Sequence, residues 1–329
     1  MIQTIRHLTV AAALAAVCCC GAHVCAQSLG APYSSNYTLT DLGSVSGVPT
    51  LYGGITFLNN NTILLGGSAN NSGGAIYEET VVRNITGQIT GFSGTATLFA
   101  TAPFIDGGLS YGPGGDLFAT GYPNNTLLEY KPGSTSPDKT ITLTGSGIAS
   151  SVGSLAFIPS GFANAGGMII ASYNASIWYD VSLTPDGLGT YNVNTVTNPV
   201  SIGGGPEGIV FVNPTNPDFS VNSTLVCDYA SGLVTAYQLD ANSNPIVTTA
   251  QTFISGLTGA EGAVIDPVTG DFLFSTFGGG NQVYEVSGFT PPPGPSSGTP
   301  EPGTEGLLVG LGISVTVCFV RRRRNRVQA

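Results

Sequence analysis

One pattern occurs five times between residues 50 and 290, and it constrains the fold more than any other feature. Each copy opens with a small residue and an apolar run: YGGITF, DGGLSY, VGSLAF, PEGIVF and AEGAVI. A second run follows a turn-rich gap (TILLGG, GDLFAT, GMIIAS, STLVCD, GDFLFS), and a third run follows that (GAIYEE, TLLEYK, SIWYDV, LVTAYQL, NQVYEV). The copies are marked by Gly54, Gly108, Gly153, Gly208 and Gly262, at intervals of 54, 45, 55 and 54 residues. Such spacing indicates one supersecondary unit used repeatedly.

The runs have the composition of β-strands. They are short, rich in Val, Ile, Leu, Tyr and Phe, and bounded by Gly, Pro, Asn and Asp. A fourth, more variable run precedes the next copy, as in TATLFA, KTITLT, YNVNTV and AQTFIS. Four antiparallel strands repeated about every fifty residues predict the blades of a β-propeller. A β-sandwich would not repeat one strand order five times, and a β-helix has a much shorter period.

The ends of the repeat region indicate how the ring closes. The fifth copy passes from VYEVSGF into TPPPGPSSGTP and so lacks a fourth strand, whereas the unassigned run NYTLTDLGSV precedes the first copy. Pairing the two would complete the last blade and cover its open edge. We therefore predict that Tyr37–Val45 lies beside Val283–Val286. The predicted fold class is an all-β propeller of four-stranded blades, with five repeats visible and a degenerate sixth left open.

The N-terminus has the pattern of a secretory signal helix. Arg6 precedes an apolar stretch from Leu8 to Cys20, and Val24-Cys25-Ala26 supplies the small residues that precede a cleavage site. Residues 1–26 are therefore predicted to be a signal peptide cleaved after Ala26. A lipoprotein signal is the alternative, although none of the four cysteines in this stretch follows a convincing lipobox.

The C-terminus has a second export pattern. A run of fifteen uncharged residues, Gly306–Val320, spans about 22 Å as a helix and stands directly before four consecutive arginines. These are Arg321, Arg322, Arg323 and Arg324. A cluster of arginines resists translocation, so we expect it to act as a stop-transfer signal after a short transmembrane helix, with the body of the protein outside.

Together with Pro300, Glu301 and Pro302, this C-terminus resembles the PEP-CTERM sorting signal. The resemblance implies export, a membrane contact through the C-terminal helix, and processing of the tail by an exosortase. It divides the chain into a signal peptide (1–26), a propeller (27–289), a Pro/Gly/Ser-rich spacer (290–299) and the sorting signal (300–329). A simple tail anchor is the alternative. The predicted location is the cell envelope, the cell surface or, after processing, the extracellular space.

Composition excludes several functions of the body. Residues 27–300 carry seventeen acidic and three basic residues, a formal charge of −14, so nucleic acid is not an expected partner. Both histidines, His7 and His23, lie in the predicted signal peptide, which removes Ser-His-Asp and Cys-His mechanisms and His-ligated zinc. Cys227 is the one cysteine of the body, and its apolar strand predicts a small buried side chain.

Phrases such as EGIVFVNP, GGLSYGPGGDLFAT and EGAVIDPVTGDFLFST resemble the broad NHL, SMP-30 and gluconolactonase-like propellers. In that architecture the residues before the marker glycines converge near the central channel, and here they are Gly53, Gly107, Val152, Glu207 and Glu261. Two carboxylates on successive blades could bind a divalent cation, and Ca²⁺ is the expected ion because its ligands are oxygens. Asp106, Asp228 and Asp266 are further candidates that the sequence does not place in the ring. Alternatively, Glu207 and Glu261 cap strand starts or face solvent.

Two functions follow from these patterns. The first is an exported surface or matrix protein that binds an extracellular polysaccharide or a surface protein, without catalytic residues. The second is a divalent-metal lactonase-like hydrolase that uses Glu207 and Glu261. Three or more side-chain oxygens around one point in the channel would favour a metal site, and two isolated glutamates would exclude the lactonase.

Overall fold

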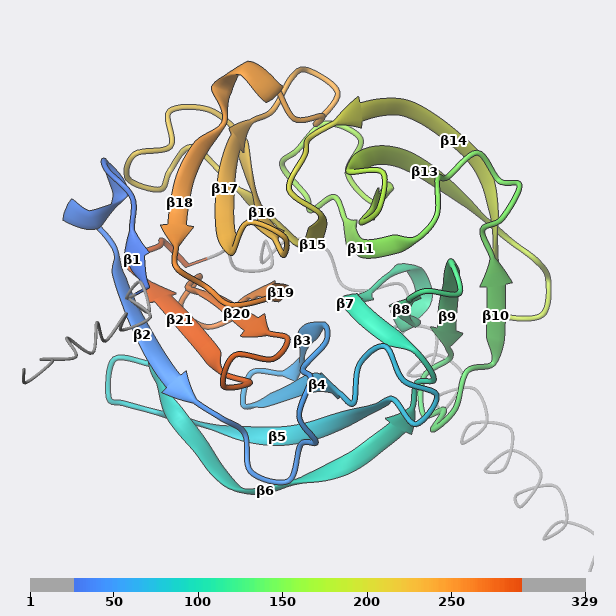
Figure 1. Ribbon diagram of the computed structural model, residues 1–329, viewed down its shortest axis with the longest axis horizontal. Coiled ribbons are helices and arrows are strands. Elements are labelled where there is room, and N and C mark those ends of the chain that lie inside the picture. Colours follow the sequence, from blue (N-terminus) through green and yellow to red (C-terminus); the bar gives the residue numbers. More distant parts are fainter. Residues whose placement is uncertain (1–26, 292–329) are drawn as a thin grey trace, which may run out of the picture.

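The computed structural model describes residues 27–291, which form a ring of five sheets around a central axis (Figure 1). The predictions on residues 1–26 and 300–329, including Pro300, Glu301, Pro302 and the four arginines, lie outside the described residues. No helix within residues 27–291 has the length and apolarity needed to cross a membrane. Three single 3-10 turns are the helical elements of this part of the chain: η1 (Tyr33–Ser35), η2 (Pro113–Gly115) and η3 (Val247–Thr249).

Each blade contains four antiparallel strands, which follow one another in order from the channel outward. Blade 1 consists of β3 (Ile55–Asn59), β4 (Thr62–Gly67), β5 (Ala75–Arg83) and β6 (Ile89–Thr101). Blade 2 consists of β7 (Ile105–Tyr111), β8 (Leu117–Gly121), β9 (Thr126–Tyr130) and β10 (Lys139–Thr142). Blade 3 consists of β11 (Val152–Phe157), β12 (Met168–Ser172), β13 (Ile177–Pro185) and β14 (Tyr191–Ser201). The predicted four-stranded repeat is therefore confirmed.

The last two blades both recruit N-terminal strands. Blade 4 consists of β15 (Pro206–Val212), β16 (Ser223–Asp228), β17 (Leu233–Gln238) and β18 (Gln251–Ser255), with β1 (Ser28–Leu29) on its outer edge. Blade 5 consists of β19 (Ala260–Ile265), β20 (Phe272–Thr276), β21 (Val283–Ser287) and β2 (Thr38–Gly43). Leu39 pairs with Val286 and Thr40 with Glu285, which confirms the predicted closure of the ring. The blade number within residues 27–291 is five, and this part of the chain does not form the sixth blade left open by the sequence.

The marker glycines allow the inner strands of neighbouring blades to approach closely. A Cβ added at Gly108 would lie 2.6 Å from the Leu155 nitrogen, and one at Gly262 would lie 2.6 Å from the Ile55 nitrogen. The other three markers also meet backbone of the following blade at 2.4 to 2.8 Å. A five-bladed ring brings its inner strands close together, so a side chain at any marker would separate two blades. This contact explains why glycine recurs at this position.

The apolar core lies between blades rather than within one sandwich. Because each blade is covered on both faces, second strands such as β8 and β12 are buried at every residue. Trp178 is completely buried and packs edge to face on Phe211 of the next blade, with 6.2 Å between ring centroids. Tyr179 belongs to a cluster with Phe118 and Leu127 of the preceding blade. Both aromatics of SIWYDV therefore pack between blades.

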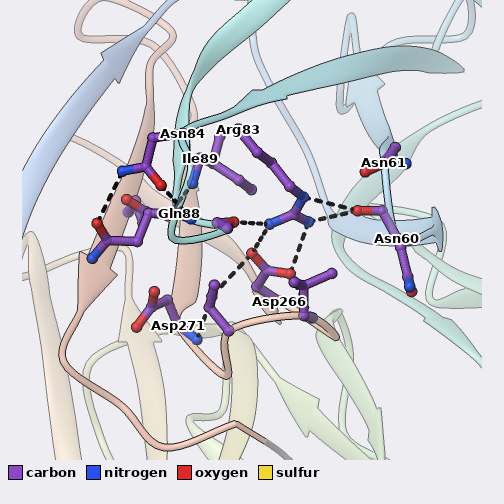
Figure 2. Close-up of polar contacts among 12 residues, drawn as sticks. Asn60, Asn61, Arg83, Asn84, Gln88, Ile89, Asp266 and Asp271 are labelled. Carbon is purple, nitrogen blue, oxygen red and sulfur yellow. Dashed lines mark hydrogen bonds and ion pairs between the residues drawn. The ribbon is translucent and has the colours of Figure 1, made fainter.

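An ion pair joins the end of β5 in blade 1 to the β19–β20 turn of blade 5 (Figure 2). Arg83 donates to both carboxylate oxygens of Asp266, at 2.6 and 2.9 Å, and also to the carbonyls of Asn60 and Gly87. The Asp266 side chain is fully buried and that of Arg83 is 12% exposed. Paired bonds between a planar guanidinium and a carboxylate are directional, so this contact fixes the β5–β6 hairpin against the β19–β20 turn.

Candidate functional site: a carboxylate cluster at one end of the channel

The structure brings Glu207 and Glu261 together at the start of two inner strands. Glu207 is the second residue of β15 and Glu261 the second residue of β19, so both stand at the same end of the central channel. Their side chains reach a common point with Asp106 of β7, and one carboxylate oxygen from each of the three lies within 4.8 Å of the others. The site therefore holds three carboxylates rather than two isolated glutamates.

Asp106 reaches the site because blade 2 has a larger irregularity than its neighbours. Between β7 and β8, Ile105 pairs with Gly121 and Leu109 with Ala119, so two extra residues are inserted in β7. Blades 4 and 5 insert one extra residue at the same place. The additional residue of blade 2 shifts the inward-facing position from Gly107 to Asp106. A count from the marker glycine consequently selects the wrong residue in this blade.

The other candidate positions do not contribute to the cluster. Gly53, Gly107 and Val152 supply no side-chain oxygen, as the sequence indicates. Asp266 is held by Arg83 and follows the last residue of β19, whereas Glu261 stands at the start of that strand. Asp228 accepts a hydrogen bond from the Thr235 hydroxyl and does not line the cavity that holds the three carboxylates.

The three carboxylates are buried without enough hydrogen-bond donors. Asp106, Glu207 and Glu261 are 2%, 3% and 1% exposed, and each has one buried oxygen that no donor reaches within residues 27–291. Desolvation raises the pKa of Asp106 to about 8. Burial, followed by the charge of Asp106, raises the pKa of Glu207, and burial, followed by the charges of Glu207 and Asp106, raises that of Glu261. Ionisation of all three at neutral pH requires a compensating positive charge.

Two glycines leave room for the Glu207 carboxylate. A Cβ built at Gly153 would lie 2.5 Å from Glu207 Oε2, and one at Gly107 would lie 2.6 Å from the same atom. Glu207 thus extends from blade 4 across the inner strands of blades 2 and 3. Neither glycine has the positive φ that would by itself demand glycine, so the space is used by the carboxylate.

The carboxylates form the floor of a cavity of about 120 Å³. Its walls are Asn70, Tyr122, Tyr173 and Tyr229. Asn70 has a left-handed backbone conformation (φ 63°), its backbone N–H donates to the Ile105 carbonyl at 2.9 Å, and its side-chain oxygen has no donor among residues 27–291. A fourth unpartnered oxygen therefore stands beside the three carboxylates.

Sequence comparison between the copies could have found the tyrosines. Each follows the second strand of its blade, in ATGYP, ASYN and CDYA, and Phe277 follows β20 in the same place. The corresponding residue of blade 1 is Ser68. These aromatic residues lie just beyond the ends of the second strands. The apolar pattern that defines the strands therefore does not include them.

No protein-family model matches this sequence, and no curated protein matches it. Solved structures with a similar arrangement include an auxiliary nutrient binding protein from Bacteroides ovatus, which is 13% identical over 77% of this chain and 76% of that chain, with a TM-score of 0.40. A streptogramin B lyase (10% identical, 77% and 98% covered, TM-score 0.41) and a glucose dehydrogenase (12% identical, 76% and 99% covered, TM-score 0.42) are similar to a comparable degree. These similarities support no conclusion about activity.

Proposed function

We propose that this protein is an exported binding or scaffold propeller whose channel holds a divalent cation, Ca²⁺, between Asp106, Glu207 and Glu261. The observation that carries the proposal is the unpartnered oxygen on each of these three buried carboxylates. Buried charges are normally paired or coordinated to a metal ion, because an unpaired charge loses its hydration without compensation. A single cation at the centre of the cluster would compensate all three side chains.

The donor set favours Ca²⁺ among common cations. The cluster offers carboxylate oxygens with the Asn70 amide oxygen beside them, and Ca²⁺ accepts six to eight oxygen ligands in flexible geometry. Zinc prefers nitrogen or sulfur ligands, and the cavity is lined by neither histidine nor cysteine. The ligand atoms come from three blades, so the ion would also tie blades 2, 4 and 5 together.

Delivery outside the cell is the second part of the proposal. Residues 1–26 would direct export, and residues 300–329 would be recognised and processed by an exosortase at Pro300-Glu301-Pro302. The acidic body would then act at the cell surface or in the extracellular matrix, with a polysaccharide or a surface protein as its partner. Replacing the three motif residues by alanines should leave the C-terminal tail on the protein and keep it in the membrane fraction. Mature mass and cell fractionation measure this.

Calcium binding is tested by thermal unfolding and isothermal titration calorimetry of the purified protein. We expect CaCl₂ to raise Tm and Glu207→Gln to abolish the rise, because ligand binding to the native state alone stabilises it by about 2.7 kcal/mol at a hundredfold excess over Kd. Glu79→Gln is the matched control, since Glu79 is equally buried but lies on β5 outside the cavity. A Tm independent of Ca²⁺ in the wild-type protein would refute the site.

A divalent-metal lactonase remains the second candidate, and the third carboxylate favours it. A hydrolase also needs a general base, and in this cavity one of the three carboxylates would have to take that role without histidine. Hydrolysis of simple γ- and δ-lactones, measured with Ca²⁺, Mn²⁺ or Zn²⁺ and in Glu207→Gln, separates the two functions. The binding protein predicts calcium binding without turnover.

A further inference from the structure

Aromatic rings form an arc over the carboxylate cluster. Tyr122, Tyr173, Tyr229 and Phe277 occupy one repeat position in four successive blades, and all four are partly exposed. Consecutive ring centroids are 5.7, 5.7 and 5.8 Å apart, with interplanar angles of 86°, 82° and 68°. Edge-to-face contacts of this kind hold rings in fixed mutual orientations. The arc is therefore a built feature of the channel end rather than a set of scattered surface residues.

Three of these rings belong to the cavity itself. Tyr122, Tyr173 and Tyr229 line it together with the carboxylates. The negative charge of Glu207 adds to the effect of burial in raising the pKa of Tyr173, and that of Glu261 does the same for Tyr229. The cavity thus has aromatic walls and a floor of three carboxyl groups, whose ionisation a bound cation would favour.

Within residues 27–291, the basic side chains are engaged elsewhere. Arg83 pairs with Asp266, Lys131 with Asp138 and Lys139 with Asp186. The unpartnered oxygens of the carboxylates, all at least nine-tenths buried, point into a cavity with no basic side chain in its lining. The positive charge has to come from a ligand.

We propose that the cavity accepts a small organic ammonium ion, with its charged nitrogen at Asp106, Glu207 and Glu261 and its alkyl groups against Tyr122, Tyr173 and Tyr229. A metal ion needs only the oxygens, whereas aromatic walls attract the diffuse charge of a substituted ammonium and contact its apolar substituents. The inference rests on the proposed function only in that both use the carboxylates as a cation site. It does not require a bound metal, and it makes Ca²⁺ and the ammonium ion competitors.

The test uses choline chloride and its uncharged analogue of the same shape, 3,3-dimethylbutan-1-ol, titrated into the purified protein in EGTA by calorimetry. We expect choline to bind at least tenfold more tightly than the alcohol, and CaCl₂ added in excess over EGTA to displace it. Tyr173→Leu should weaken choline binding at least fivefold and leave Ca²⁺ binding unchanged. Tyr173→Phe should retain choline binding, because it keeps the ring. Circular dichroism checks that each variant is folded, and Tyr122→Leu is the second variant of the wall.

The outcomes separate the two proposals. Calcium binding without choline binding, or equal affinity for choline and the alcohol, overturns the ammonium site and leaves the metal site standing; equal affinity would indicate a neutral ligand such as a sugar. Choline binding without calcium binding overturns the metal site alone. Loss of choline binding in Tyr173→Phe as well as Tyr173→Leu would also count against the aromatic wall as a cation site.

Discussion

The two ends of the central channel are built from the same five inner strands but have opposite chemistry. At the strand starts, three carboxylates, an amide and three tyrosines surround a small cavity. At the strand ends, a cavity of about 180 Å³ is lined mainly by apolar residues from all five inner strands, including Leu109, Leu155, Val210 and Val264. The fold therefore places residues of the inner strands at both ends of the channel without determining what they are.

The two ends also differ in how far their polar side-chain atoms are satisfied. The apolar end leaves no unpartnered side-chain polar atom among the residues that line it, so packing accounts for its composition. The acidic end leaves four unpartnered oxygens, which packing does not explain and which cost free energy in the absence of a ligand. Variants at the two ends should accordingly separate stability from cation binding.

The largest effect on stability is expected at the apolar end. Phe211 is 4% exposed and packs on Phe162 and Trp178. Phe211→Ala should cost about 3–5 kcal/mol of unfolding free energy, because it removes a buried aromatic ring and leaves a cavity. The increase in Tm on adding CaCl₂ should persist in this variant. Urea denaturation with and without Ca²⁺ measures both quantities, and loss of the calcium response would mean that the two ends are not independent.

A smaller loss of stability is expected at Gly153, where the backbone of blade 3 contacts the carboxylate of Glu207. Gly153→Ala places a Cβ 2.5 Å from Glu207 Oε2 and 2.6 Å from the Pro206 carbonyl oxygen. We expect a loss of about 1–3 kcal/mol in stability from overpacking, and a calcium affinity at least tenfold lower because Glu207 has to move. Gly54→Ala is the matched control, since its Cβ meets Leu109 and Gly107 but no carboxylate. Equal calcium affinities in the two variants would contradict the role of Gly153.

The sequence predicts the ring well because the ring depends on features that repeat. Five copies of one strand pattern give the blade number, and a missing fourth strand beside an unassigned N-terminal run gives the closure of β2 on β21. The repeated position of the marker glycines can be recognised in the sequence. The physical reason for glycine there is the contact between backbones of neighbouring blades, which only the structure shows.

The site is less predictable because it depends on departures from the repeat. Glu207 and Glu261 stand at equivalent positions and were found by counting from the markers. Asp106 entered as a candidate without a place in the ring, because an extra inserted residue in β7 changes which side chain faces the channel. No period in the sequence reveals such an insertion. Tyr122, Tyr173 and Tyr229 do repeat, but each stands one residue after the end of a strand and so lies outside the strand pattern.

The smallest effect is expected at Glu129, a buried carboxyl group that lies outside the channel cluster and has a structural role. Glu129 is fully buried in blade 2, and its Oε2 accepts the backbone N–H of Tyr191 from blade 3 at 3.1 Å. Burial raises the pKa of Glu129 to about 7. The hydrogen bond from Tyr191 and the charge of Lys139 oppose this rise, and Asp116 adds to it.

The neutral form of Glu129 is thus favoured in the folded state. Its contribution to stability is complete below the unfolded pKa of about 4.3 and is lost as pH rises through about 7. In EGTA, Glu129→Gln should match the wild type at pH 4 and exceed it by about 1–2 kcal/mol at pH 8, because the amide stays neutral. The channel carboxylates titrate equally in both proteins and cancel in the difference. An unchanged gap between the two proteins at both pH values would show that Glu129 does not titrate in this range, and calcium binding should be the same in both.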